Sequence, residues 1–225
     1  MDATLEADAD APAPRTKPLL RGVSHEIAAG VALAGLVALV LLAPGPRARL
    51  AGAIYGGSLV ALFAVSALYH RPTWGPRARL WMRRLDHSAI FLLIAGTYTP
   101  LCLLLGDGRS RTLLAVVWVG AGLGMLRALL WPKAPRAVST SLYLALGWAA
   151  VPLVPAIWRT LGPVPLLLLA AGGLLYTVGG VIYASRRPDP FPRVFGYHEI
   201  FHALVIAAAG LHFAVAAGAV RALGG

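Results

Sequence analysis

Two histidines lie four residues apart in the segment His198-Glu199-Ile200-Phe201-His202, which opens a long apolar stretch near the end of the chain. Four residues is slightly more than one turn of an α-helix, so both imidazoles project from the same helical face. Two imidazoles in this arrangement can bind one metal ion together. The spacing therefore predicts two metal ligands, provided that further ligands reach the same place from other segments.

Two other apolar stretches carry polar side chains at their ends. Ser66 and His70 are one helical turn apart at the end of one stretch, and Asp86 opens the next. Three imidazoles suit a borderline ion such as zinc, which in catalytic sites has three protein ligands and a fourth position open to water. We therefore predict that His70, His198 and His202 bind Zn²⁺.

Asp86 and Ser66 are the candidate catalytic residues beside these ligands. A carboxylate next to a metal site can take a proton from water, and the metal lowers the pKa of that water to about 7. The Ser66 hydroxyl can hydrogen-bond the water, a substrate carbonyl or Asp86. Together these side chains could activate a water molecule bound to the metal.

The elements that must position these residues are transmembrane helices. Hydrophobic residues make up 58% of the 225 residues, charged residues make up 13%, and the mean hydropathy is +0.72, which excludes an ordinary soluble domain. A membrane-spanning helix needs about 20 apolar residues. Seven segments meet this requirement, so we expect an all-α bundle of seven transmembrane helices: 25–43, 50–70, 86–105, 112–131, 138–158, 163–185 and 197–221.

The distribution of basic residues predicts the orientation of the bundle. Of the 20 Lys and Arg residues, 14 lie in the N-terminal tail and in the loops 2–3, 4–5 and 6–7 with their flanks, and six lie on the other side. The positive-inside rule then places the N-terminus in the cytoplasm and the C-terminus outside. The formal charge of +11 is explained by this topology. The sequence has no patch of basic and aromatic residues, so we expect no nucleic acid as a partner.

This topology brings the candidate ligands to one depth. Span 2 ends at the cytoplasmic side and spans 3 and 7 begin there, so His70, Asp86, His198 and His202 all lie near that face. Ionisable groups in a membrane domain are costly and usually functional. The acidic, Ala- and Pro-rich residues 1–22 are expected to form a disordered cytoplasmic tail before the membrane domain, residues 23–222.

The order of these motifs resembles the hemolysin III family, which is part of the progestin and adipoQ receptor group. The resemblance covers residues 20–221. It implies a seven-helix bundle with zinc bound by His70, His198 and His202 beside Asp86 and Ser66. It also implies kinship with membrane ceramidases, which hydrolyse lipid amides. We expect the protein in the cell membrane, as a multi-pass protein of a bacterial plasma membrane. The segments that carry the resemblance are Ser24-His25, Ser66-Ala67-Leu68-Tyr69-His70, Leu85-Asp86-His87-Ser88, Ala95-Gly96-Thr97-Tyr98-Thr99-Pro100 and Gly196-Tyr197-His198-Glu199-Ile200-Phe201-His202.

Glu199 supports a competing hypothesis, because His198-Glu199-x-x-His202 also matches the zinc metalloprotease motif with glutamate as general base. Intramembrane metalloproteases with a similar motif carry it in an early span and take an Asp ligand from a later one, which is the reverse of the order here. The protease scheme also gives His70 no role. We expect Glu199 to pair with Arg193 or another interfacial group.

Other ionisable residues are expected to have structural roles. His25 and His87 are expected at the interfaces, where imidazoles cap helices or reach water. His212 lies about 15 Å deeper than His202 and is expected to pack or to bond between helices. Glu26 is expected to pair with an interfacial arginine or to lie near the site.

The sequence therefore predicts a zinc-dependent hydrolase of lipid amides or esters at the cytoplasmic membrane face, with membrane lipids as partners. A pore-forming, cytolytic protein with structural zinc is the alternative from a different class. A receptor-like regulator that keeps the metal without turnover is a third. The lipid and the oligomeric state do not follow from the sequence.

Overall fold

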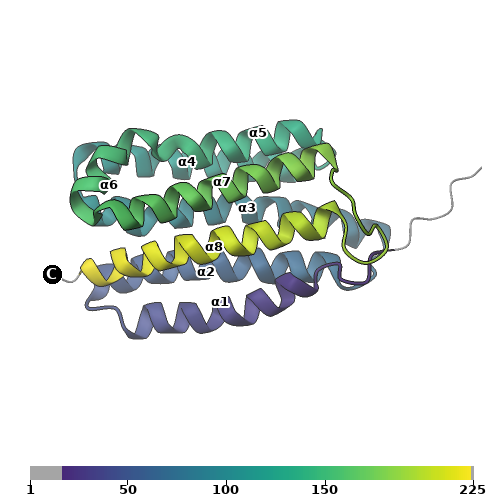
Figure 1. Ribbon diagram of the computed structural model, residues 1–225, viewed down its shortest axis with the longest axis horizontal. Coiled ribbons are helices and arrows are strands. Elements are labelled where there is room, and N and C mark those ends of the chain that lie inside the picture. Colours follow the sequence, from purple (N-terminus) through teal and green to yellow (C-terminus); the bar gives the residue numbers. More distant parts are fainter. Residues whose placement is uncertain (1–16, 224–225) are drawn as a thin grey trace, which may run out of the picture.

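The computed structural model describes residues 17–223 of the chain, and these residues form an all-helical bundle (Figure 1). Seven helical segments in this part of the chain are long and apolar enough to cross a membrane, which confirms the predicted number of spans. Most of the expected disordered tail, residues 1–16, lies outside the described residues. The elements are α1 (Val23–Leu41), α2 (Pro46–His70), α3 (Pro76–Leu105), α4 (Gly108–Leu130), α5 (Arg136–Gly147), η1 (Trp148–Leu153), α6 (Val154–Leu161), α7 (Pro163–Ser185) and α8 (Tyr197–Ala222).

Two helices hold the bundle together. α3 contacts α2 and α4 on its two sides and also reaches α5, α6 and α8, while α8 contacts α1, α2, α3 and α7. Figure 1 shows α8 running between the pair α1 and α2 and the pair α7 and α5. The candidate ligands lie on α2, α3 and α8, so they belong to helices that pack against one another.

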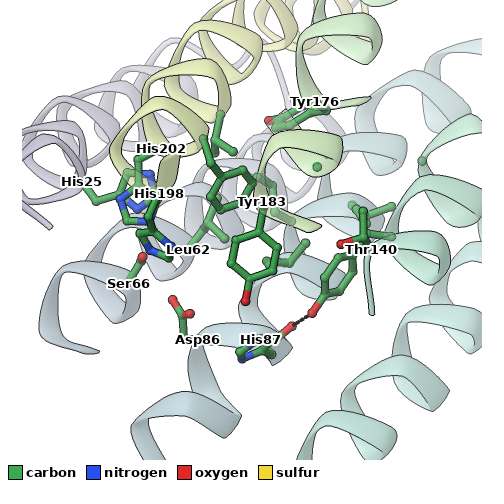
Figure 2. Close-up of a pocket in the computed structure, with 18 of the residues that line it drawn as sticks. His25, Leu62, Ser66, Asp86, His87, Thr140, Tyr176, Tyr183, His198 and His202 are labelled. Carbon is green, nitrogen blue, oxygen red and sulfur yellow. Dashed lines mark hydrogen bonds between the residues drawn. The ribbon is translucent and has the colours of Figure 1, made fainter. Parts of the chain in front are cut away.

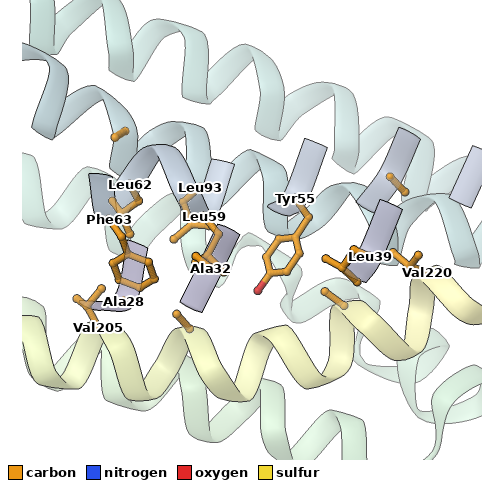
Figure 3. Packing of buried hydrophobic residues seen from close by; sticks show 14 of the residues in the cluster. Ala28, Ala32, Leu39, Tyr55, Leu59, Leu62, Phe63, Leu93, Val205 and Val220 are labelled. Atoms are coloured by element: carbon orange, nitrogen blue, oxygen red, sulfur yellow. The ribbon is translucent and has the colours of Figure 1, made fainter. Parts of the chain in front are cut away.

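The main apolar core lies where α1, α2, α3 and α8 meet (Figure 3). Phe63 of α2 and Val205 of α8 are buried there together with Ala28 of α1. Large apolar side chains also cover the outside of the bundle, and Val31 and Leu123 are 69% and 63% exposed. An apolar exterior around fully hydrogen-bonded helices is what a lipid environment requires.

Small residues allow the helices to approach closely. A Cβ atom at Gly56 would lie 3.0 Å from the Leu36 Cα atom, so α2 touches the backbone of α1 there. Gly124 of α4 likewise leaves room for the ring of Phe91 on α3. Close packing at small residues is a main source of helix association in membranes.

The third and fifth spans differ from the predicted segments. α3 begins at Pro76, ten residues before the predicted start. Proline suits the first helical position, and the arginine-rich residues that follow are compatible with a helix outside the apolar region. Asp86 therefore lies within α3 rather than at its start. The fifth span is interrupted by the 3₁₀ segment η1, which contains Pro152; proline removes a helical hydrogen bond.

The basic loops gather at one end of the bundle, which we call the basic end: residues 71–75, 131–135 and 186–196, with the N-terminal segment 17–22. The backbone N–H groups of Leu19 and Leu20 donate to the carbonyls of Arg193 and Val194. The Lys17 amine donates to the Arg71 carbonyl at 2.7 Å. The N-terminal segment thereby bridges the loops before α3 and α8.

Candidate metal centre

The three predicted histidine ligands converge at the basic end of the bundle. His70 is the last residue of α2, and His198 and His202 lie in the first two turns of α8. All three side chains are buried, and one ring nitrogen of each lies within 4.8 Å of the corresponding atoms of the other two. The Nε2 atoms of His70 and His198 are 3.1 Å apart.

This geometry suits a small divalent cation. Each Zn–N bond is about 2.0–2.1 Å, so two ligand nitrogens of a tetrahedral zinc ion lie about 3.3 Å apart. The 3.1 Å separation of the His70 and His198 nitrogens is close to that value. Two imidazole nitrogens at this distance need a proton or a cation between their lone pairs. The three residues could therefore hold a metal ion.

His25 of α1 also belongs to this cluster, although we expected it at the interface. Its ring stacks on that of His202, with the centroids 3.8 Å apart and the planes inclined by 7°. The side chain is 3% exposed, and neither ring nitrogen has a hydrogen-bond partner among residues 17–223. Gly22, whose φ of 81° is left-handed, lets the start of α1 lie close to the end of α2, because a Cβ there would be 2.8 Å from the His70 Cβ.

The two candidate catalytic residues, Ser66 and Asp86, lie near the histidines. Ser66 is buried one turn before His70 on α2, and Asp86 is half-buried on α3. Both residues line the same cavity as the imidazoles, and Figure 2 shows the Asp86 carboxylate and the Ser66 hydroxyl directed toward a common space below His198. A carboxylate, a hydroxyl and three imidazoles around one cavity are a set of groups suited to hydrolysis.

Glu199 points away from this cluster and is fully engaged elsewhere. One carboxylate oxygen forms an ion pair with Arg21 at 2.5 Å, and the other accepts from the Gly196 backbone N–H at 2.9 Å, which caps α8. The side chain is 4% exposed. The partner is thus an interfacial arginine, but Arg21 rather than Arg193. With both oxygens occupied, Glu199 is poorly placed to act as the general base of a protease.

The remaining singled-out residues have local partners. A ring nitrogen of His212 lies 3.1 Å from the Leu169 carbonyl oxygen of α7, which confirms the predicted bond between helices. Glu26 pairs with Arg71 at 2.8 Å near the surface, as expected. His87 is half-buried, and its Nδ1 atom lies 2.7 Å from the Arg83 carbonyl oxygen.

The site opens into a cavity of about 1580 Å³. This volume exceeds the roughly 300–1,000 Å³ that is usual for small-molecule sites. The cavity extends from the basic end to His212, ten residues beyond His202 and thus about 15 Å further along α8. Its inner part is lined by apolar side chains such as Leu101, Ile157 and Leu166. The cavity therefore has a polar mouth and an apolar interior.

The mouth is strongly basic. Burial lowers the pKa of the Lys17 amine below its usual value, and the neighbouring cations Arg71 and Arg21 lower it further. The only carboxylates among the residues that line the cavity are Asp86 and Asp189. Seven cations line it: Lys17, Arg21, Arg79, Arg83, Arg136, Arg186 and Arg193.

Two residues of the site went unnoticed in the sequence. Tyr183 of α7 faces the cluster, with its ring centroid 5.8 Å from that of His198 (Figure 2). Arg136 stacks on Tyr183, with its Cζ atom 4.9 Å from the ring centroid. Neither belongs to a motif, and only their position in an apolar span or beside one could have drawn attention to them.

Comparison with known proteins identifies relatives of the whole membrane region. The model of the family "Haemolysin-III related" matches residues 14–213. Hemolysin-3 of Bacillus cereus is 31% identical over 87% of this chain and 88% of its own length. A hemolysin-3 homolog of Bacillus subtilis is 31% identical over 87% and 90%. The human monocyte to macrophage differentiation factor is 30% identical over 71% and 66%.

Proposed function

The chain belongs to the haemolysin III-related family and has seven helices that can span a membrane, and on that premise we propose that it is a zinc-dependent hydrolase of amide or ester bonds in membrane lipids. One observation carries this proposal: His70, His198 and His202 bring three ring nitrogens within 4.8 Å of one another, at the mouth of a cavity deep enough for a lipid chain. A purely structural site would need no such cavity.

The residues around the histidines have distinct roles in the proposed reaction. A bound zinc ion supplies a Lewis acid, which polarises a carbonyl group and makes water more acidic. Asp86 takes the proton from the attacking water, because it is the carboxylate of the cavity that lies beside the imidazoles. The Ser66 hydroxyl donates a hydrogen bond to the carbonyl oxygen as negative charge develops there.

The surroundings of the site support a lipid substrate. The apolar inner cavity takes the acyl chain, while the polar mouth leaves the amide or ester beside the histidines. The three imidazoles are buried, and a metal ion would supply a partner for their ring nitrogens away from water. Water reaches the bond from the open mouth of the cavity.

The test is lipid hydrolysis by the purified protein. The full chain in detergent is incubated with a panel of ceramides and phospholipids, with and without a chelator, and released fatty acid is measured by mass spectrometry. We expect release that the chelator abolishes and added zinc restores. Release that persists after complete metal removal would overturn metal-dependent hydrolysis.

A wild-type protein that binds zinc but hydrolyses nothing in the panel would favour a different class. Two of the relatives are named hemolysin-3, so lysis is the activity to examine in that event. Dye release from liposomes that contain the protein separates a pore-forming protein from a receptor-like regulator, because only the pore releases dye.

A further inference from the structure

We propose that the basic mouth of the cavity binds an anionic, phosphate-type headgroup of an amphiphile, with Arg136 and Arg83 as its principal contacts. That the bound molecule is then hydrolysed rests on the proposed function. The binding site itself rests on the contacts at the mouth of the cavity. It narrows the substrate class from membrane lipids in general to amphiphiles with an anionic group close to the bond that is cleaved.

Arg136 is held in place as a binding residue would be. Its guanidinium stacks on Tyr183 and lies 5.6 Å from the ring centroid of Tyr197. One of its terminal nitrogens donates to the Tyr197 hydroxyl at 3.0 Å. No carboxylate among residues 17–223 forms an ion pair with Arg136. A preorganised guanidinium of this kind matches the geometry of phosphate and carboxylate groups.

Arg83 provides a second inward cation. It is half-buried on α3, one turn before Asp86, and it lines the cavity without forming an ion pair within the described part of the chain. Of the seven cations at the mouth, only Arg21 has such a pair there, with Glu199. The mouth therefore keeps a large excess of positive charge over a low-dielectric cavity, which concentrates anions.

The positive-inside rule accounts for the number of basic residues at this end but not for their direction. Arg77, Lys133 and Arg187 meet that rule from exposed positions outside the cavity. Arg136 and Arg83 are half-buried and line it instead. An arginine that only sets the orientation of the protein in the membrane would not need to lie between two aromatic rings, as Arg136 does.

The proposed anion site lies next to the histidine cluster. The Tyr183 ring lies 4.9 Å from the Arg136 Cζ atom and 5.8 Å from the His198 ring centroid, so it separates the guanidinium from the imidazoles. Tyr197, which accepts from Arg136, directly precedes His198 on α8. A headgroup bound at Arg136 would hold the adjoining amide or ester beside the histidines, with the acyl chain in the apolar interior.

The test compares three probes with the full chain in maltoside detergent, measured by native mass spectrometry: a lysophosphatidic acid, the monoacylglycerol of the same acyl chain, and inorganic phosphate. We expect the lysophosphatidic acid to bind about tenfold more tightly than the monoacylglycerol or better, since a charge-assisted hydrogen bond is worth that much. Inorganic phosphate should compete only weakly. Equal affinity for the two lipids would overturn the proposal, and so would competition by free phosphate as strong as that by the anionic lipid.

Matched variants separate this site from general charge. Arg136→Gln and Arg83→Gln should each reduce binding of the lysophosphatidic acid about tenfold and leave monoacylglycerol binding unchanged, which also shows that the variants fold. Arg187→Gln removes the same charge from an exposed position and should change neither. Loss of anionic-lipid binding in Arg187→Gln equal to that in Arg136→Gln would reduce the effect to bulk electrostatics and contradict the proposal.

The same measurement distinguishes this inference from the proposed hydrolysis. The double variant His198→Ala/His202→Ala should keep its preference for the anionic lipid even where hydrolysis is lost. A wild-type protein that prefers the anionic lipid but hydrolyses nothing supports the headgroup site and contradicts only the enzyme. A protein that hydrolyses neutral lipids and shows no preference contradicts the headgroup site alone.

Discussion

The imidazole rings of His25 and His202 are stacked in parallel, 3.8 Å apart, in the buried space between α1 and α8. The two residues touch through the faces of their rings. The ring nitrogens of His25 have no hydrogen-bond partner among residues 17–223. The His25 ring therefore orients His202, one of the three proposed metal ligands, without being part of the group of three. Residues that orient a ligand affect metal affinity strongly.

We expect His25→Ala to lower zinc affinity about tenfold, because His202 loses the surface against which it is oriented. His25→Phe should keep most of the affinity, since phenylalanine retains a flat ring. Competition with a fluorescent chelator measures both, with His87→Ala as the control. Equal losses in the two His25 variants would mean that His25 binds the metal itself.

The ion pair between Arg21 and Glu199 fastens the N-terminal segment to the start of α8. Arg21→Gln leaves a buried carboxylate without its cation, so we expect the free energy of unfolding to fall by about 1–3 kcal/mol. Arg21→Gln/Glu199→Gln should be less destabilised than the single variant. Thermal unfolding in detergent measures this.

The control for that comparison is Arg71→Gln, which breaks the exposed pair with Glu26. Exposed pairs contribute little, so its melting temperature should stay close to that of the wild type. A double variant of Arg21 and Glu199 that is less stable than Arg21→Gln alone would refute the account of this pair.

Asp86 is the proposed general base, whereas Glu199 has only a structural role. Asp86→Asn keeps the size of the side chain but cannot accept a proton, so turnover should fall about a hundredfold or more while the three histidines still bind zinc. Glu199→Gln should change turnover little. Lipid hydrolysis and zinc content are measured for both variants. Loss of activity only in Glu199→Gln would restore the protease hypothesis.

The 14 basic residues at one end predict the orientation of the bundle in the membrane. A reporter that is active only outside the cytoplasm, fused after Gly225, should be active, and the same reporter fused at the N-terminus should not. The opposite pattern would place the histidine cluster at the outer face.

Much of the site could be predicted from the sequence, because helix geometry and hydropathy are local properties. The four-residue spacing of His198 and His202 fixes their common face, and the alternation of spans brings His70 to the same end. The stacking of His25 on His202 depends on how α1 packs against α8, which no local pattern records. Glu199 pairs with Arg21, 178 residues away, for the same reason.

The helices were predicted correctly from the apolar segments where the ends of the apolar segment and of the helix coincide. They diverge in α3, since the residues from Pro76 to Leu85 are helical but include four arginines. They diverge again at Pro152, where the span stays apolar but the α-helix gives way to a 3₁₀ turn. Hydropathy predicts which residues lie in the membrane, whereas helix caps and prolines determine where a helix begins, ends or is interrupted.

The central claim is that His70, His198 and His202 together bind one zinc ion, and metal analysis of the purified protein tests it most directly. Inductively coupled plasma mass spectrometry should find about one zinc ion per wild-type chain and per His212→Ala chain, because three imidazoles suit zinc and His212 lies outside the group of three. His70→Ala should bind much less zinc, and His198→Ala/His202→Ala should bind essentially none. Stoichiometric zinc in that double variant would contradict the account.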